Sequence, residues 1–305
     1  MNQKELQPLV ANLFAQGRRR TVRVAVEQEF LVADATTGAA VPIERVRRAA
    51  AGAIAAPYLS FEPGGQLELS LPCSLDPVGQ LRMMVADLTH RLTAAHITTY
   101  ALPVDPRPEH EVPLQLTSPR YVAMHRHFDS IGPAGRRMMR RTASTQLCLD
   151  WWPGQAGLEQ WRVLNLAGPY LAATFARSSG PHGRLTTWLE TDPARTGFDD
   201  RLLVGDPVAA YTAFAVGATA FVGTAAEHLT TMFPPVRPRS TYLEVRFLDA
   251  QEPSAIGPVV SALTSLMYDD NHRRSVLRRL EVDRADLGEH WLAAAAGDLD
   301  LELVA

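Results

Sequence analysis

Glutamate residues recur at alternate positions in short apolar segments of the chain. Glu27 and Glu29 stand two residues apart in segment 23–30, Glu62 and Glu68 flank a Pro-Gly-Gly turn, and Glu244 lies in segment 242–247. Side chains two residues apart on a strand point to the same face. Carboxylates that face one another across a sheet destabilise it, whereas magnesium and manganese prefer oxygen ligands of this kind. The spacing therefore predicts a divalent-metal site on one concave face of a sheet.

Other polar side chains accompany these carboxylates. Gln146, Cys148 and Asp150 share one face of segment 145–150, and Glu244 and Arg246 share one face of segment 242–247. A sheet face that is merely solvated is the alternative, but such a face carries Lys, Thr and Ser. Arg and Gln would instead hold anionic or amide groups of a substrate. Cys148 lacks the neighbouring His or Asn that marks a nucleophile, so a small pocket side chain is the favoured interpretation.

The composition excludes several classes of protein. The chain has 305 residues, 46% of them hydrophobic and 21% charged, with a formal net charge of −3. Disorder, coiled coil and electrostatic attraction to nucleic acid or an anionic membrane are therefore disfavoured. Two cysteines are too few for a disulfide framework or a thiolate zinc site, and no signal peptide is evident, so we expect a cytoplasmic protein. The uncharged stretch 208–226 is about as long as a membrane span, but its Ala, Thr and Gly favour a buried helix or a helix–strand pair.

Periodicity predicts an α+β protein with one domain over residues 1–305. Strand patterns cover 23–30, 66–70, 145–150 and 242–247, and helical patterns cover 77–100, 119–128, 158–177 and 254–280. Asp76 and Pro77 predict the start of the first of these helices. Strands separated by helices and joined by long connections indicate one mixed sheet with helices packed on one side. A doubly wound nucleotide fold is disfavoured because no strand leads into a Gly-rich helix start.

Several of these motifs, in this order, resemble one family. They are Val-Glu-Gln-Glu-Phe at 26–30, Glu-Pro-Gly-Gly-Gln-Leu-Glu-Leu-Ser at 62–70, Arg120-Tyr121 with Met124, Thr-Ala-Ser-Thr-Gln-Leu-Cys-Leu-Asp at 142–150, Trp188 with 192–197, and the segments 228–239 and 242–250. Over about residues 20 to 270 the chain resembles the plant-like and actinobacterial glutamate–cysteine ligases, most of all the ergothioneine-pathway type. It resembles a shortened member of that family.

The resemblance implies a carboxylate–amine ligase on a glutamine-synthetase-like fold, a curved antiparallel sheet that forms a funnel with flanking helices. ATP would phosphorylate the side-chain carboxylate of glutamate, and the amine of cysteine or another amino acid would attack the acyl phosphate. The implied cofactors are ATP and Mg²⁺, with Mn²⁺ as an alternative ion. The implied metal ligands are Glu27, Glu29, Glu62, Glu68 and Glu244, with Glu62 and Arg246 as catalytic residues. The implied substrate contacts are Gln146, Cys148, Arg184, Trp188, Arg195, Arg237, Arg239 and Tyr242.

The sequence departs from the family pattern at positions that bear on the substrate. Cys148 replaces a usual Asn, Thr186 replaces a usual second Arg, and the chain between Phe221 and His228 is shorter. Two alternatives therefore stay open: a γ-glutamyl ligase of specialised metabolism with a non-cysteine acceptor, and a non-catalytic paralogue that binds glutamate. The expected partners are small-molecule substrates, with no nucleic acid and no membrane. The short segment also predicts either a homo-oligomer that covers the site or a ligase with poorly coupled turnover.

Overall fold

Seven strands form one sheet in the computed structural model, which describes residues 1–301. The strand order is β2-β3-β1-β5-β7-β6, and β4 pairs with the far end of the long strand β1. Every strand pair is antiparallel. The strands are β1 (Val24–Asp34), β2 (Leu59–Phe61), β3 (Leu67–Ser70), β4 (Ile97–Tyr100), β5 (Thr145–Asp150), β6 (Val236–Arg239) and β7 (Tyr242–Val245).

The register separates a polar face of the sheet from an apolar one. Glu29 lies opposite Glu68, Glu27 opposite both Ser70 and Gln146, and Cys148 opposite Glu244. Directly opposed residues of an antiparallel pair share a face, so the carboxylates predicted from the alternation all point to one side. The intervening residues Leu67, Leu69, Leu147, Leu149, Leu243 and Val245 are buried on the other side.

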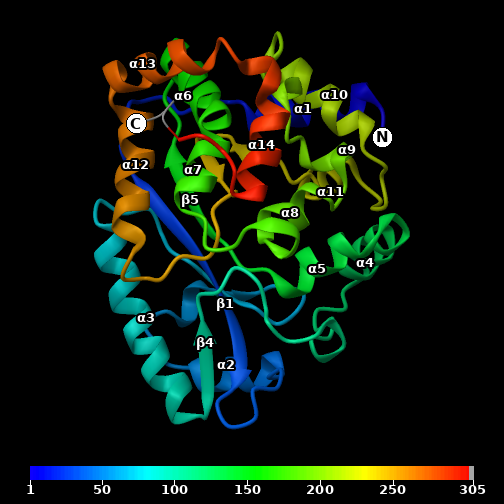
Figure 1. Cartoon of the computed structure of the whole chain (residues 1–305), viewed down its shortest axis with the longest axis vertical. Coiled ribbons are helices and arrows are strands. Elements are labelled where there is room, and N and C mark those ends of the chain that lie inside the picture. The colour runs from blue at the N-terminus through cyan, green and yellow to red at the C-terminus, as the bar shows by residue number, and fades with distance from the viewer. Residues whose placement is uncertain (302–305) are drawn as a thin grey trace.

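Helices cover both faces of this sheet. On the apolar side, α3 packs against β1 and α12 packs against β5. In Figure 1, α3 runs beside β1 and β4, while α4, α5 and α8 lie on the opposite side of the view. The helices are α1 (Gln3–Leu13), α2 (Ile43–Ala50), α3 (Pro77–Ala94), α4 (Pro119–Ile131), α5 (Pro133–Arg141), α6 (Gln155–Leu166), α7 (Gly168–Thr174), α8 (Arg184–Leu189), α9 (Pro193–Thr196), α10 (Pro207–Gly217), α11 (Ala225–Thr230), α12 (Ile256–Tyr268), α13 (Asp270–Leu280) and α14 (Leu287–Ala296), with short 3₁₀ turns between some of them.

The α+β class is confirmed, as is the antiparallel sheet with flanking helices that the resemblance implies, whereas the periodicity alone was wrong in some details. The sheet is antiparallel rather than mixed, and helices flank it on two sides rather than one. The predicted helix 77–100 ends at Ala94, because the backbone turns at His96, whose φ of 57° is left-handed. Residues 97–100 then form strand β4. Segments 158–177 and 254–280, each predicted as one helix, form two helices each. The break in segment 254–280 lies at Asp269, which caps α13.

The uncharged stretch 208–226 contains α10, the loop 218–224 and the start of α11. Tyr211 and Phe214 of α10 are buried, and Phe14 of α1 packs edge-on against Tyr211 with ring centroids 5.7 Å apart. A buried helix is therefore the correct interpretation of this stretch. Within residues 1–301, no helix combines the length and apolar character that a membrane crossing requires.

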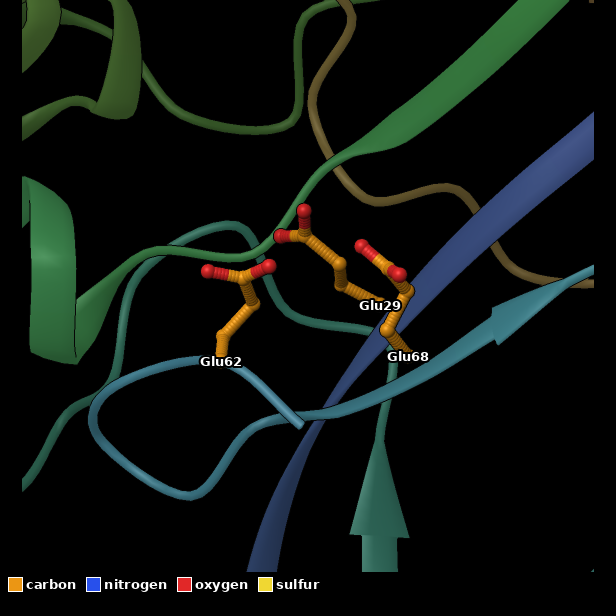
Figure 2. A group of neighbouring side chains, drawn as sticks. All are labelled: Glu29, Glu62 and Glu68. Carbon is orange, nitrogen blue, oxygen red and sulfur yellow. The ribbon is translucent and has the colours of Figure 1, made fainter. Parts of the chain in front are cut away.

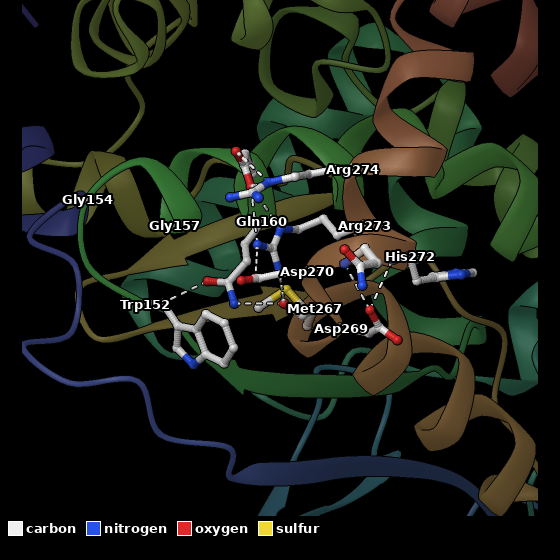
Figure 3. Close-up of polar contacts among 12 residues, drawn as sticks. Trp152, Gly154, Gly157, Gln160, Met267, Asp269, Asp270, His272, Arg273 and Arg274 are labelled. Atoms are coloured by element: carbon white, nitrogen blue, oxygen red, sulfur yellow. Dashed lines mark hydrogen bonds and ion pairs between the residues drawn. The ribbon is translucent and has the colours of Figure 1, made fainter.

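A buried arginine joins α6 to α13 behind the sheet (Figure 3). The guanidinium of Arg273 is fully buried, donates to the Met267 carbonyl at 2.8 Å and pairs with Glu159 of α6 at 3.1 Å. Gln160 of α6 donates to the same carbonyl at 2.9 Å and accepts from the Trp152 backbone N–H. These polar contacts fix α13 against α6, the helix that follows β5.

Candidate active site

A cavity of about 320 Å³ lies over the polar face of the sheet. One side of it is formed by strand residues and the Glu62 turn, and the other side by α4, α5, α8 and α11. Of the residues that the sequence implicates, it contains Glu27, Glu29, Glu62, Glu68, Gln146, Arg184, Trp188, Arg237, Arg239, Glu244 and Arg246. The alternation of strand side chains explains why residues more than 200 positions apart line one cavity.

Three carboxylates converge at one end of this cavity (Figure 2). Each of Glu29, Glu62 and Glu68 offers an oxygen within 4.8 Å of the oxygens of the other two. Glu29 accepts from the Ser144 backbone N–H at 2.8 Å, and Glu68 accepts from the Ser60 hydroxyl at 2.6 Å. The carboxylate of Glu62 makes no hydrogen bond to any described residue. Burial, reinforced by Glu29 and Glu68, raises the pKa of Glu62 well above its ordinary value. Uncompensated negative charge of this kind fits a divalent cation.

The turn that carries Glu62 is held rigidly against α5. Gly64 faces the Arg140 carbonyl so closely that an added Cβ would lie 2.2 Å from its oxygen. Gly65 has a φ of 89°, which favours glycine. Gln66 accepts from the Gly64 N–H at 2.9 Å and donates to the Thr142 carbonyl at 2.8 Å. The Pro-Gly-Gly sequence thus places the carboxylate of Glu62 against strand β1.

Glu27 lies between this cluster and the arginines, and no described residue offers it a cationic partner within 4 Å. Burial, together with the charges of Glu244 and Glu68, raises the pKa of Glu27 to about 7. Among residues 1–301, its one side-chain hydrogen-bond partner is Cys148, whose Sγ is 3.7 Å from Oε1. Burial raises the pKa of the Cys148 thiol well above its usual value, so the thiol is protonated and a poor nucleophile. Cys148 is 6% exposed and lies behind Glu27 rather than on the cavity wall.

Glu244 occupies the opposite end of the cavity, among three arginines. Its carboxylate oxygens lie 3.5 Å from Arg237, 2.9 Å from Arg239 and 2.9 Å from Arg246. Burial opposes its ionisation, but the three guanidinium groups outweigh burial and lower the pKa of Glu244. Glu244 is therefore ionised and already neutralised. In this structure it orients arginines, which differs from the metal-ligand role that the resemblance implies.

Several buried N–H donors around the cavity have no hydrogen-bond acceptor among the described residues. They are Nη1 of Arg246 and Nε of Arg237 at the arginine end, with Nε of Arg120 and Nε1 of Trp188. Buried polar groups in native proteins are nearly always paired. Their clustering within one cavity indicates a ligand that offers anionic or carbonyl oxygens. The cavity thus has an acidic end that fits a cation and a donor-rich end that fits an anion.

Arg184 supports the arginine end from behind. Its guanidinium donates to the carbonyl oxygens of Arg246 at 3.0 Å and Phe247 at 3.2 Å, and it lies 5.1 Å from the ring centroid of Trp188. Arg246 in turn lies 5.8 Å from the same ring and donates to Gln146 Oε1 at 3.2 Å. Arg184 therefore positions Arg246 and Trp188, in addition to lining the cavity.

Besides Cys148, two of the implied substrate contacts lie outside the cavity lining. Arg195 is fully buried in an ion pair with Asp192 at 2.7 Å, donates to Thr231 and stacks on Phe221 at 4.6 Å. Its donors are used to hold the loop 218–224 and the end of α11, so its role here is structural. Tyr242, opposite Asp150 at the start of β7, also lies outside the lining.

Some cavity residues were not selected from the sequence as site residues. Arg120, Tyr121 and Met124 of α4, together with Phe233, form the wall opposite the sheet. Arg120 donates to the Thr230 carbonyl at 3.2 Å and so joins α4 to α11. The Arg120-Tyr121 pair in the first turn of α4 was the sequence feature from which these cavity residues could have been found. Alternation on strands gave no information about helices that approach the sheet from the far side.

Comparison with known proteins agrees with the resemblance. Residues 23–296 match the profile of glutamate-cysteine ligase family 2. The glutamate–cysteine ligase EgtA of Mycolicibacterium smegmatis is 30% identical over 258 residues, covering 69% of this chain and 60% of the relative. The chloroplastic enzyme of Arabidopsis thaliana is 25% identical over 286 residues, covering 77% of this chain and 52% of the relative. The chain therefore spans between about half and three fifths of the length of these relatives.

A solved structure shows the same fold at low sequence identity. The glutamate–cysteine ligase of Francisella tularensis in complex with AMP aligns with a TM-score of 0.50 at 13% identity, covering 95% of this chain and 81% of that one. This likeness shows the fold, and the profile match over residues 23–296 confirms the family implied by the motifs. The chain belongs to glutamate–cysteine ligase family 2.

Proposed function

We propose that the protein is an ATP-dependent γ-glutamyl ligase, which joins the side-chain carboxylate of glutamate to the amine of cysteine or another amino acid. The observation that carries the proposal is the division of one cavity into a carboxylate end and an end with unpartnered donors. A metal–nucleotide complex presents cations and phosphate oxygens side by side, and it complements such a cavity.

The acidic end fits magnesium by its chemistry. Glu29, Glu62 and Glu68 would hold the ion through hard carboxylate oxygens, and their uncompensated charge favours its binding. When bound, the ion would neutralise charge on the phosphate groups during transfer. Glu27 lies next to this group and is available to a second cation or to the substrate amine.

The donor end would bind the anionic groups of the substrates. Arg246 and Arg237 would hold phosphoryl oxygens, and Arg246 would stabilise the charge that develops as phosphate passes to the glutamate carboxylate. Arg120 and Trp188 would donate to carboxylate oxygens of the amino acids. Met124, Met138 and Phe233 form an apolar wall that limits the access of water to the acyl phosphate.

Cys148 has only an indirect bearing on the identity of the acceptor amine. Because Cys148 lies behind Glu27, its replacement of Asn would affect the acceptor only through the position of Glu27. Thr186 donates to the Gly180 carbonyl at 2.7 Å and does not line the cavity. Cysteine and other amino acids are therefore both candidates within the proposed class.

Phosphate release tests the proposal. The protein would be incubated with ATP, magnesium and glutamate, with each amino acid or amine in turn as acceptor, and products would be identified by mass spectrometry. A γ-glutamyl amide formed only when all components are present supports the ligase. Glutamate binding without phosphate release under any acceptor would instead support a non-catalytic paralogue. Sedimentation of the same sample would establish whether a homo-oligomer carries the activity.

A further inference from the structure

A second cavity of about 340 Å³ lies on the same face of strand β1 as the carboxylates, farther along the strand. Alternate residues of β1 share a face, so Leu31 and Ala33 continue the side that carries Glu29, and both line this cavity. Tyr100 of β4 lies directly opposite Leu31, shares its face and lines the cavity as well. In the lower part of Figure 1, β1 and β4 run together. The polar face of the sheet thus becomes apolar where β1 pairs with β4.

A small buried cluster separates this cavity from the one over the carboxylates, which we call the central cavity. Leu31 packs there with Ala143 and Ala250, and Leu102 packs against them. The residue after Ala143 is Ser144, whose backbone N–H donates to Glu29 in the central cavity. Among the described residues, none lines both cavities. The second cavity is therefore a separate site rather than an extension of the central one.

The segment that follows β4 forms another wall of the second cavity, and backbone hydrogen bonds hold it in place. Asp105 donates its N–H to the Arg141 carbonyl at 2.7 Å, and Arg141 donates through Nη2 to the Asp105 carbonyl at 2.7 Å. The N–H of Ala143 donates to the Pro103 carbonyl at 3.0 Å. A wall that is fixed before binding costs little further ordering when a ligand enters.

One buried donor in this wall lacks an acceptor. Arg107 lines the cavity, and its Nε and Nη2 both donate to the carboxylate of the buried Asp105, with Nε 3.0 Å from Oδ1. Nη1 of Arg107 is also buried and has no hydrogen-bond partner among the described residues. Buried donors in native proteins are nearly always paired, so Nη1 indicates a ligand or water that offers an oxygen. Because Asp105 already neutralises the guanidinium, an uncharged acceptor fits this wall better than an anion.

We infer that this cavity binds a small aromatic molecule that carries an uncharged carbonyl group. Its ring would lie against Leu31, Leu102 and Tyr100, and its carbonyl oxygen would accept from Nη1 of Arg107. The volume lies near the lower limit of the ~300–1,000 Å³ that is typical of small-molecule sites, so one ring with a short substituent fits. The inference does not depend on the proposed ligase function, because that function assigns no role to the residues of this cavity.

Benzamide is a probe of this chemistry, and benzoate is its matched anion. Both have one planar ring and a carbonyl oxygen, but only benzoate carries a charge. We expect the wild type to bind benzamide saturably in the second cavity. Benzoate should not enter there, because Asp105 disfavours a second anion, and any benzoate that binds should occupy the arginines of the central cavity. Calorimetric titration of the full chain with each compound measures both affinities.

Variants of the cavity wall locate the binding. Tyr100 is exposed, so Tyr100→Ala removes an aromatic wall with little effect on the core. This variant should bind benzamide about fivefold more weakly and benzoate with unchanged affinity. Tyr58→Ala, at an exposed tyrosine outside both cavities, is the matched control and should bind benzamide as the wild type does. Arg107→Lys keeps a cation beside Asp105 but removes Nη1, and it should weaken benzamide about threefold to tenfold while the protein melts near the wild-type temperature.

The outcomes decide the inference without any nucleotide. Absence of saturable benzamide binding, or unchanged benzamide affinity in Tyr100→Ala, would show that the cavity is not the site. Equal weakening of benzamide by Tyr100→Ala and Tyr58→Ala would mean that the effect is not local, and it would also overturn the inference. If Tyr100→Ala weakens benzoate as much as benzamide, the cavity accepts anions and the assignment of an uncharged carbonyl is wrong. None of these results bears on the proposed ligase function, which phosphate release tests separately.

Discussion

Glu62 is the carboxylate whose charge the protein compensates least. It is buried beside Glu29 and Glu68, and it accepts no hydrogen bond from the described residues. Removing its charge from the cation-free protein therefore relieves repulsion, whereas removing it from the loaded protein deletes a ligand.

We predict that Glu62→Gln loses magnesium-dependent phosphate release while the cation-free protein stays at least as stable as wild type. Magnesium with ATP should raise the melting temperature of the wild type through linkage, and this rise should disappear in the variant. Differential scanning fluorimetry with and without magnesium–ATP measures both effects. Glu44→Gln, at an exposed position of α2, is the control and should retain the rise. A cation-free Glu62→Gln protein that melts far below wild type would indicate a structural role instead.

Glu27 makes the stability of the cation-free protein depend on pH. Its pKa is about 7 in the folded chain, against an ordinary value of 4.5. Between these two pH values the unfolded chain releases the proton and the folded chain retains it, so rising pH removes stability. We predict that the wild type loses on the order of 2 kcal/mol relative to Glu27→Gln between about pH 4.5 and 7.

Urea unfolding of both proteins across this pH range, in the presence of a chelator, measures the difference. Titrating groups far from Glu27 act equally in the two proteins and cancel, whereas Glu68 and Glu244, which interact with Glu27, contribute to the measured difference. A difference that stays constant with pH would show that Glu27 is ionised in the folded chain without penalty. Saturating magnesium should shrink the pH dependence of the wild type, because a bound cation favours the charged carboxylate.

At the scale of helices and strands, one arginine holds a helix pair. Glu159 of α6 pairs with the fully buried Arg273 of α13. It also pairs with Nε of the half-exposed Arg274 of α13, at 3.1 Å. We predict that Arg273→Met lowers the free energy of unfolding by about 3–5 kcal/mol, because it removes the fully buried partner of Glu159 and leaves that carboxylate only the half-exposed Arg274. Arg274→Met removes a solvent-screened pair and should cost about 0–1 kcal/mol.

Urea denaturation of the two variants provides this comparison, since both lose one arginine next to the same glutamate. Equal destabilisation would mean that burial does not determine the strength of the α6–α13 contact. The central cavity lies on the other side of the sheet, so the folded fraction of each variant should bind magnesium–ATP as the wild type does.

The strands with clear alternation were predictable, and those without it were not. Segments 23–30 and 145–150 alternate except at Ala25, Gln28 and Thr145, so β1 and β5 and the face of their carboxylates followed from the sequence. Strand β6 reads Val-Arg-Pro-Arg, and its proline argued against a strand although it lies at a sheet edge, where a missing N–H is tolerated. Strand β2 has three residues, too few for any period.

The same distinction explains which site residues could be predicted. Glu27, Glu29, Glu68 and Glu244 share a face by register, so local spacing determined their direction. The direction of Arg195 depends instead on how the four-residue helix α9 packs against the loop 218–224, which no local pattern encodes. The role of Arg120 was likewise not predictable from the sequence, because its place in the cavity depends on how α4 lies over the sheet.

At the scale of the whole molecule, the loop 218–224 bears on how well the site excludes water. Arg195 holds the loop by donating to the Thr219 carbonyl and stacking on Phe221. Phe214 of the preceding helix is buried within the chain and is not available to an interface between subunits. We therefore expect turnover to be imperfectly coupled, with more than one phosphate released per γ-glutamyl product, because water reaches the acyl phosphate.

Product and phosphate measured in the same reaction give this ratio, and sedimentation velocity gives the oligomeric state. A monomer that forms one product per phosphate would contradict the expectation, since it would show that one chain closes its own site. A homo-oligomer with a ratio of one would show that a second copy completes the closure.

The turn at Gly64 has a consequence for how this protein can change over evolutionary time. Any side chain at Gly64 collides with the Arg140 carbonyl, and Gly65 holds a backbone conformation that other residues seldom adopt. The turn that carries Glu62 therefore requires glycine at both positions. A substitution there would move the backbone and displace the Glu62 carboxylate from the cluster. Adaptation to another ion or substrate has to proceed through side chains whose exchange leaves the main chain in place. Cys148, buried behind Glu27 on a regular strand, is a position of that kind.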